Sequence, residues 1–248
     1  MKNKYVIPKF VSNSRFGNWL FLTAACYAHC LRNGYDLRIP YEKPLLNKLI
    51  VEKFNSPQYI DLTDKPTFNE TTYHYSPIPK DHVGFISGFF QSSKYFSDFE
   101  EEIKELFDEL VSENKTENTA AIHVRMGDYL KFSYRYKSPT KDFIEKAISK
   151  LSPNISKLVV CSDEINKAVK LVKSCKGAEK LTIIPSHCNE IEDIRTLTSC
   201  EEFIMSCSSF SWWAAYLGNH KKVIVDKKWY NDNQFKEDDI YEKSWIKI

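Results

Sequence analysis

The residues with the clearest chemical potential follow a predicted buried strand, where residues 123–129 read HVRMGDY. Residues two apart in a strand project from the same face, so His123 and Arg125 are expected side by side where the strand ends. Gly127 allows a sharp turn or the close approach of a ligand. The planar fork of an arginine suits two phosphate oxygens. An ion pair between Arg125 and Asp128 that only ties down a loop is the alternative, and this pattern alone favours neither.

A second candidate is the segment 206–217, SCSSFSWWAAYL, in which small hydroxyl residues end a strand and begin a helix. Free N–H groups and hydroxyls at a helix start bind anions, which makes Ser208, Ser209 and Ser211 candidate ligands of a phosphate. Ordinary capping by serine is the alternative, and the segment taken alone favours it. The tryptophans are expected in the core.

A third candidate is Ser162-Asp163, directly after the apolar stretch KLVVC at 157–161. A carboxylate there could accept hydrogen bonds from N1–H and the exocyclic amine of guanine, and so distinguish guanine from adenine. Aspartate after a strand is more often the cap of the next helix, and the pair by itself favours that interpretation.

Several common sites are disfavoured. The loop SRFGN at 14–18 has a single glycine, with neither G-x-G-x-x-G nor a Walker lysine, which argues against a nicotinamide or P-loop site. No D-x-D motif, histidine ligand spacing or G-x-S-x-G elbow is present, so a bridging metal and an α/β-hydrolase nucleophile are not indicated.

The elements that must position these residues alternate between strand and helix in the second half. The predicted strands are 119–124, 157–161, 180–184, 203–205 and 223–225, and the predicted helices are one capped by Ser138, then 164–175, 191–200 and 210–217. Such alternation implies right-handed crossovers and a parallel sheet, with ligands at the carboxyl ends of the strands.

The first half begins with another β-α-β unit, predicted as strand 5–11, helix 18–32, a stop at Gly34 and strand 36–39. Residues 41–92 show little periodicity. An amphipathic helix is predicted over 97–111, and the polar stretch 112–118 is a predicted linker, which places the domain boundary there.

Composition bounds the remaining possibilities. The 248 residues include 35 Lys and Arg against 33 Asp and Glu, so net charge draws the chain to neither nucleic acid nor anionic lipid, and any basic function must be local. Seven cysteines without a C-x-x-C pair argue against a zinc ribbon or a disulfide framework. A reducing, cytoplasmic location is expected, with no membrane-spanning segment.

Six segments together resemble the α-1,2-fucosyltransferases of glycosyltransferase family 11 and, more distantly, the α-1,6- and protein O-fucosyltransferases. In family order they are SRFGN (14–18), GFFQSSKYF (88–96), HVRMGDY (123–129), VVCSD (159–163), SCSSFSWWAAYL (206–217) and VDKKWY (225–230). Two positions depart from the family pattern: Met126 replaces the second arginine of its motif, and Trp19 replaces a glutamine.

The resemblance implies an α/β fold of two Rossmann-like domains facing a cleft, the GT-B type. Residues 1–115 would form an acceptor-side domain and 116–248 a nucleotide-sugar-binding domain. It implies transfer of fucose from GDP-fucose to a glycan hydroxyl, α-1,2 to a galactose-type sugar, with inversion and without a metal or cofactor. Another nucleotide sugar, or a glycan-binding protein without turnover, are the alternatives.

The resemblance also suggests roles for the candidates. Arg125, with Ser208, Ser209 and Ser211, would stabilise the leaving diphosphate, Asp163 would contact guanine, and His123 would contact the nucleotide or organise the arginine. Asp128 would be the base or would orient Arg125, and Asn18 would position the acceptor hydroxyl. The remaining expected donor contacts are Gly17, Ser162 and Phe210.

Overall fold

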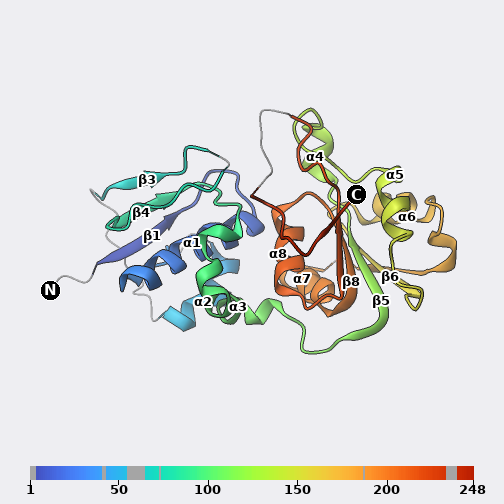
Figure 1. The fold of residues 1–248 in the computed structure, drawn as a ribbon, viewed down its shortest axis with the longest axis horizontal. Coiled ribbons are helices and arrows are strands. Elements are labelled where there is room, and N and C mark those ends of the chain that lie inside the picture. The colour runs from blue at the N-terminus through green and yellow to red at the C-terminus, as the bar shows by residue number, and fades with distance from the viewer. Residues whose placement is uncertain (1–3, 41–42, 55–64, 73, 187, 233–238) are drawn as a thin grey trace. The chain divides into compact units, whose positions relative to one another are not determined.

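The computed structural model describes residues 4–40, 43–54, 65–72, 74–186, 188–232 and 239–248 (Figure 1). The chain divides into two compact units. The first contains Met1–Glu109 and Asp238–Tyr241, and the second contains Leu110–Glu237 and Glu242–Ile248. Each unit has a parallel sheet of its own.

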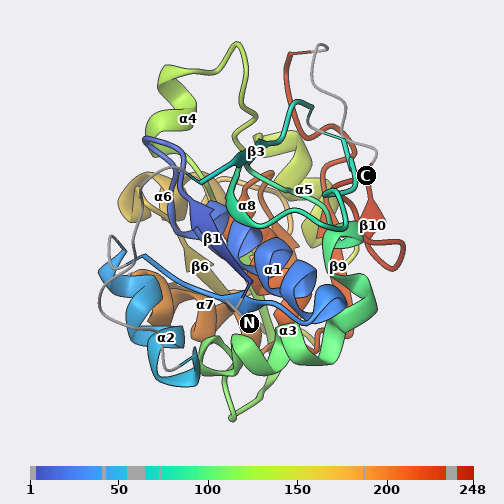
Figure 2. The same cartoon turned by 90° about the vertical axis from the view of Figure 1, so that its left-hand side faces the viewer.

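The sheet of the first unit has the strand order β2-β1-β4-β3, and every described pair is parallel. Its strands are β1 (Tyr5–Lys9), β2 (Asp36–Leu37), β3 (Thr67–Asn69) and β4 (Gly84–Ser87). Its helices are α1 (Phe16–Asn33), α2 (Pro44–Phe54) and α3 (Glu100–Leu106), which lie on the same side of β1 and β4 (Figures 1 and 2). Gly34 ends α1 in the left-handed region, at φ +65°.

The predicted single helix over 97–111 is wrong in its extent. Only Glu100–Leu106 is α-helical, with 3₁₀ turns at Ser97–Phe99 and Asp108–Leu110 on either side. Phe96 and Phe107, which flank the helix, are fully buried and leave helical geometry, so burial of these rings overrides the regular helical pattern. The elements α2, β3 and β4 were not predicted, because 41–92 lacks a clear period.

The sheet of the second unit has the order β10-β9-β8-β5-β6-β7 and is parallel throughout. Its strands are β5 (Thr116–His123), β6 (Lys157–Cys161), β7 (Thr182–Ser186), β8 (Cys200–Met205), β9 (Lys222–Val225) and β10 (Ile246–Lys247). Its helices are α4 (Gly127–Lys131), α5 (Lys141–Ile148), α6 (Ile165–Lys173), α7 (Glu190–Ser199) and α8 (Ser209–Leu217).

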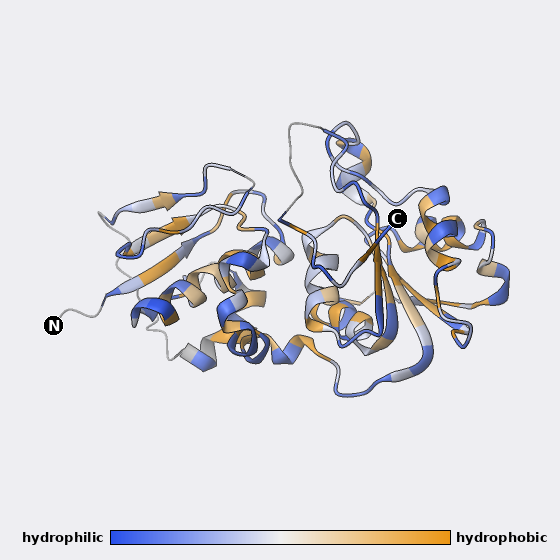
Figure 3. Cartoon of the chain, in the orientation of Figure 1, coloured by the Kyte–Doolittle hydropathy of each residue, from blue (hydrophilic) through white to orange (hydrophobic). Residues whose placement is uncertain are grey.

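Helices cover both faces of this second sheet, as in a Rossmann-like fold. Helices α7 and α8 lie on one face and α5 and α6 on the other (Figure 1). Strands β6 and β8 are mostly apolar and buried, whereas β5 is exposed over its first three residues and buried from Thr119 to His123, where it carries the apolar residues Ala120, Ala121 and Ile122 (Figure 3). The predicted α/β class with a parallel sheet is therefore confirmed.

Several boundaries in the second unit differ from prediction, among them the starts of β5, β8 and α5. Strand β5 begins at Thr116, so the predicted linker over 112–118 is wrong in its last three residues, and Ser112 N already donates to Thr198 Oγ1 at 3.0 Å. Helix α5 is capped by Thr140, whose hydroxyl accepts from Phe143 N at 3.2 Å, and Ser138 does not cap it. Among the described residues, no helix combines the length and apolar character that a membrane crossing requires.

Candidate functional site

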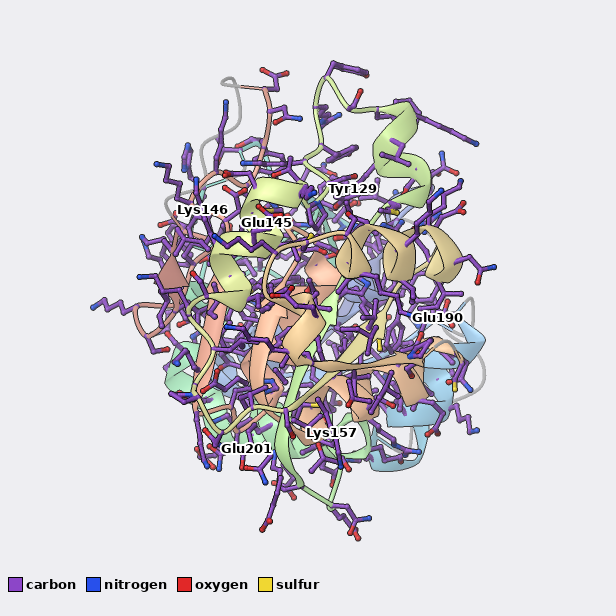
Figure 4. The ribbon with its side chains drawn as sticks, turned by 90° about the vertical axis from the view of Figure 1, so that its right-hand side faces the viewer. Tyr129, Glu145, Lys146, Lys157, Glu190 and Glu201 are labelled. Carbon is purple, nitrogen blue, oxygen red and sulfur yellow. The ribbon has the colours of Figure 1, made fainter. Side chains whose placement is uncertain are left out.

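Three of the predicted segments meet at the carboxyl edge of the second sheet, because β8, β5 and β6 are neighbours. Ser206 Oγ donates to the carbonyl of His123 and accepts from Arg125 N at 2.9 Å. From the other side, Ser162 Oγ donates to the carbonyl of Val124 at 2.6 Å. Figure 4 shows Tyr129 near this edge, opposite the end where Lys157 and Glu201 lie. The sheet order thus joins motifs that are far apart in the sequence.

The Arg125 guanidinium lies between two carboxylates. Its Nη2 is 2.5 Å from Asp128 Oδ1 and its Nη1 is 2.9 Å from Asp163 Oδ2, while 11% of the side chain is exposed. The guanidinium carbon, Cζ, also lies 5.3 Å from the centroid of the Tyr129 ring. An arginine carries five N–H donors, and these two contacts require only two of them. The guanidinium is thereby held in one orientation at the mouth of the sheet.

Asp163 also holds the loop that carries the arginine. Its Oδ1 accepts from Met126 N at 2.9 Å, while its Oδ2 pairs with Arg125. A Cβ atom at Gly127 would overlap this carboxylate, so a larger residue there would force Asp163 to shift. Asp163 thus ties the end of β6 to the loop after β5, and a contact with guanine stays a prediction.

The start of α8 has features of an anion site. Ser208 is the residue before the helix, and among the described residues its side chain makes no capping hydrogen bond. The N–H groups of Ser209, Phe210 and Ser211 lie in the first turn, where no carbonyl of the preceding turn of the helix is present to accept their hydrogen bonds. Such N–H groups, together with the positive end of the helix dipole, attract phosphate.

Two of the predicted donor-binding hydroxyls are used inside the protein. Ser211 is fully buried and its Oγ accepts from Ser206 N at 3.1 Å. Ser162 is 2% exposed and its Oγ, besides donating to Val124 O, accepts from Glu164 N at 3.0 Å. Both serines stabilise the loops at the strand ends, and their contact with a donor stays a prediction.

His123 is buried beside the α8 start. It is 5% exposed, its ring centroid lies 5.1 Å from that of Phe210, and Nδ1 has no hydrogen-bond partner among the described residues. Burial, followed by the charge of Arg125, lowers the pKa of His123 to about 3. The imidazole is therefore neutral at physiological pH and can act by hydrogen bonding but not as a cation.

Gly17 and Asn18 lie in the first unit, in the first turn of α1. Asn18 N donates to Arg15 O at 2.9 Å, and Asn18 Oδ1 accepts from Gln91 Nε2 at 2.7 Å. The Asn18 side chain is half-buried and Gly17 is buried. Gln91 therefore fixes the orientation of the Asn18 amide, a contact that the sequence analysis did not predict.

Gln91 is itself held by an unusual turn. Phe90, which precedes it, has φ +50°, a left-handed conformation that is costly for a bulky residue. Glu70 Oε2 accepts from Phe89 N at 2.7 Å and from Phe90 N at 3.0 Å, and burial raises the pKa of Glu70. Glu70 lies in a segment without clear periodicity, so only the conspicuous motif GFFQSSKYF pointed to this region.

Trp19, one of the two departures from the family pattern, closes the loop before α1. Its Nε1 donates to Ser14 O at 3.0 Å, and Lys43 Nζ lies 4.8 Å from its ring centroid. Met126, the other departure, is 8% exposed and belongs to the apolar core of the second unit. Methionine is uncharged, so Met126 offers no cation to a phosphate, and its side chain packs in the core instead.

The described residues contain no group of three or more His, Cys, Asp or Glu that could hold a metal ion. Arg125 and the first N–H groups of α8 are positive groups at the carboxyl edge of the second sheet. A reaction without a metal ion stays a prediction.

Comparison with known proteins places the chain in a family. The model of Glycosyl transferase family 11 matches residues 36–248. The chain belongs to glycosyltransferase family 11. The match includes five of the six segments on which the predicted resemblance rests, and it begins after the sixth, the loop at 14–18. The resemblance to family 11 is confirmed.

Two curated relatives of this family 11 chain come from Escherichia coli. An alpha-1,2-colitosyltransferase is 26% identical over 186 residues, which are 68% of this chain and 63% of the relative. The O-antigen biosynthesis glycosyltransferase WbnK is 25% identical over 151 residues, 58% of this chain and 48% of the relative. The aligned part therefore spans less than two thirds of either relative.

A solved structure shares the fold. A mutant of Arabidopsis thaliana FUT1 in complex with GDP has a TM-score of 0.51 and 10% identity, covering 96% of this chain and 73% of that chain. Together with the parallel sheet in each unit, this likeness confirms the predicted fold class, two Rossmann-like domains of the GT-B type. The cleft, and the acceptor and nucleotide sides of the two domains, stay predictions.

Proposed function

We propose that this family 11 chain is a glycosyltransferase that moves fucose from GDP-fucose to a hydroxyl group of a glycan acceptor. Family membership and the glycosyltransferase names of both bacterial relatives support the reaction class. The FUT1 complex supports a guanine nucleotide, because that protein shares the fold and binds GDP.

One observation carries the proposal: a guanidinium fixed at the carboxyl edge of a parallel sheet, in the same unit as the uncapped start of α8. Negative charge develops on the diphosphate as its bond to the sugar breaks. Arg125 and the N–H groups of the first α8 turn are suited to stabilise that charge, since preorganised donors act without reorganising during the reaction. His123 is suited to a neutral hydrogen bond in the same region.

The proposed step is one displacement. The acceptor oxygen bonds to the anomeric carbon from the side opposite the diphosphate, the carbon–oxygen bond to the diphosphate breaks with its electron pair, and the hydroxyl proton passes to a base. The main role that we assign to Asp128 is to orient Arg125, because the two side chains are paired at 2.5 Å. The same carboxylate is also the candidate base within the motif. Asn18, fixed by Gln91, would position the hydroxyl.

A second donor has specific support. One relative is named alpha-1,2-colitosyltransferase, which supports colitose as an alternative transferred sugar. The α-1,2 linkage in its name supports the same linkage here, to a galactose-type sugar. The core position of Met126, where the family pattern has an arginine, adds a reason to test donors other than GDP-fucose.

The deciding experiment is incubation with GDP-fucose, GDP-colitose and UDP-sugars, each with a panel of oligosaccharides, followed by linkage and anomeric analysis of the product. The expected product is an α-1,2-linked fucoside with inverted anomeric configuration. Transfer from another donor only would replace the sugar in the proposal. If the protein binds glycans but neither transfers a sugar nor hydrolyses the donor, the proposal that it is an enzyme is wrong.

A further inference from the structure

The loop that begins at the candidate site carries an exposed apolar tip. Leu130, Phe132 and Tyr134 are 50%, 47% and 71% exposed, and they are three of the six large hydrophobic side chains that are exposed in the described part of the chain. We call residues 127–136 the aromatic lobe. Apolar exposure concentrated in five consecutive positions marks an interaction surface, whereas single exposed residues do not.

The base of the aromatic lobe is held firmly. The rings of Tyr129 and Tyr136 stack with centroids 4.7 Å apart, which closes the lobe on itself. Asn231 Nδ2 donates to Ser133 O at 2.7 Å and to Tyr136 O at 3.1 Å, which ties the lobe to the segment after β9. The ring stacking and the Asn231 hydrogen bonds therefore fix the position of the loop that carries the exposed tip.

The lobe is also locally basic, although the whole chain is near neutral. Residues 127–136 contain Lys131 and Arg135 against one acidic residue, Asp128, which is paired with Arg125. Lys137 is paired with Asp226 at 2.5 Å, whereas Lys131 is exposed and stands between Leu130 and Phe132. Lys227, close to Asn231 in the chain, is exposed as well. The tip thus combines apolar side chains with positive charge.

We propose that the aromatic lobe docks this protein on the surface of an anionic lipid bilayer, with Leu130 and Phe132 entering the interface and Lys131 facing lipid phosphates. Apolar and aromatic side chains flanked by lysine are typical of segments that lie in a bilayer interface. The lobe projects from the body of the second unit (Figures 1 and 2). Small ligands bind in concave pockets, whereas a projecting tip is suited to contact a flat surface such as a bilayer. The docking goes beyond the proposed transfer reaction.

Vesicle co-sedimentation tests the proposal with the whole chain. One set of vesicles is made of phosphatidylcholine alone, and the other is made of phosphatidylcholine and phosphatidylglycerol in equal amounts. Binding is expected to the anionic vesicles, to weaken with added salt, and to fall by roughly fivefold in Lys131→Ala. The triple variant Leu130→Ser, Phe132→Ser, Tyr134→Ser is expected to lose at least about tenfold in binding.

The matched control replaces exposed apolar residues elsewhere, Leu31→Ser with Ile184→Ser, which are 36% and 38% exposed in the native chain. The control is expected to bind as the native protein does, and thermal unfolding of all variants checks the fold. Native protein that ignores anionic vesicles, or a triple variant that binds them unchanged, overturns the proposal. So does self-association that the triple variant abolishes, or a higher KM for a soluble acceptor with vesicle binding unchanged.

Discussion

Arg125 Nη1 lies 2.9 Å from Asp163 Oδ2, an ion pair that joins the loop after β5 to the loop after β6. With Asp128 on the other arm, two carboxylates face one guanidinium. The arrangement orients the arginine for a ligand, and it also makes each of the three residues dependent on the others.

Replacing Arg125 by alanine is expected to lower the transfer rate by about 10² to 10³, because a preorganised donor to the leaving diphosphate is lost. Arg125→Lys keeps the charge without the two-armed geometry and should lie between native and alanine rates. Initial rates at saturating GDP-fucose measure this. Turnover of Arg125→Ala within a few-fold of native would remove the arginine from the mechanism.

Asp163→Asn is expected to weaken the binding of GDP, ADP and UDP by a similar factor. Both carboxylate oxygens of Asp163 hold the loop that carries Arg125, so the substitution acts on the diphosphate contact, which the three nucleotides share. Calorimetric titration of the three nucleotides gives the comparison. A loss confined to GDP would instead assign Asp163 to the guanine base, the role that the sequence predicts.

Gly127→Ala is expected to destabilise the second unit by roughly 1–3 kcal/mol, because the added methyl group overlaps the Asp163 carboxylate. In the background Asp163→Ala the same change should cost less than about 0.5 kcal/mol, since the overlapping atoms are gone. Denaturant unfolding of the four proteins completes the cycle. Additive effects of the two substitutions would contradict the contact.

Glu70→Ala is expected to destabilise the first unit by about 2 kcal/mol or more, because the N–H groups of Phe89 and Phe90 lose the oxygen that accepts both of their hydrogen bonds. Glu70→Gln keeps an acceptor oxygen and should be much milder. If Asn18 positions the acceptor, the alanine variant should also raise the acceptor KM with the donor KM unchanged. Equal effects of alanine and glutamine on stability would show that the two hydrogen bonds do not hold the Phe90 turn.

The buried His123 predicts a dependence of stability on pH. Its pKa is lowered from 6.5 to about 3, so below 6.5 the unfolded chain binds a proton that the folded protein does not. Stability should therefore fall with decreasing pH across this window, by up to about 1.4 kcal/mol per pH unit from His123. His123→Phe should reduce this acid destabilisation in urea unfolding at a series of pH values.

The reduction is expected to be partial, because burial also lowers the pKa of His29 and of His220. Both histidines remain in the His123→Phe protein and continue to favour the neutral form on folding. An unchanged slope between pH 6.5 and pH 4 would show that His123 is solvated in the folded protein.

Much of the second unit could be predicted from the sequence, because its central strands are buried on both faces and read as short apolar stretches. KLVVC at 157–161 is found as β6 without change, and the strand before HVRMGDY extends further toward the amino end than predicted. The first unit was less predictable. Burial of Phe96 and Phe107 divides one predicted helix, and Phe90 adopts a backbone conformation that no local pattern indicates.

The sequence by itself determined the family, the α/β class and the order of the chemical motifs, since these depend on residue types and local periodicity. Only the tertiary structure decided which motifs touch. Placing β5 between β8 and β6 brings Ser206 and Asp163 to Arg125, and the Phe90 turn brings Gln91 to Asn18. These contacts depend on strand order and on backbone geometry far along the chain, which local preferences do not encode.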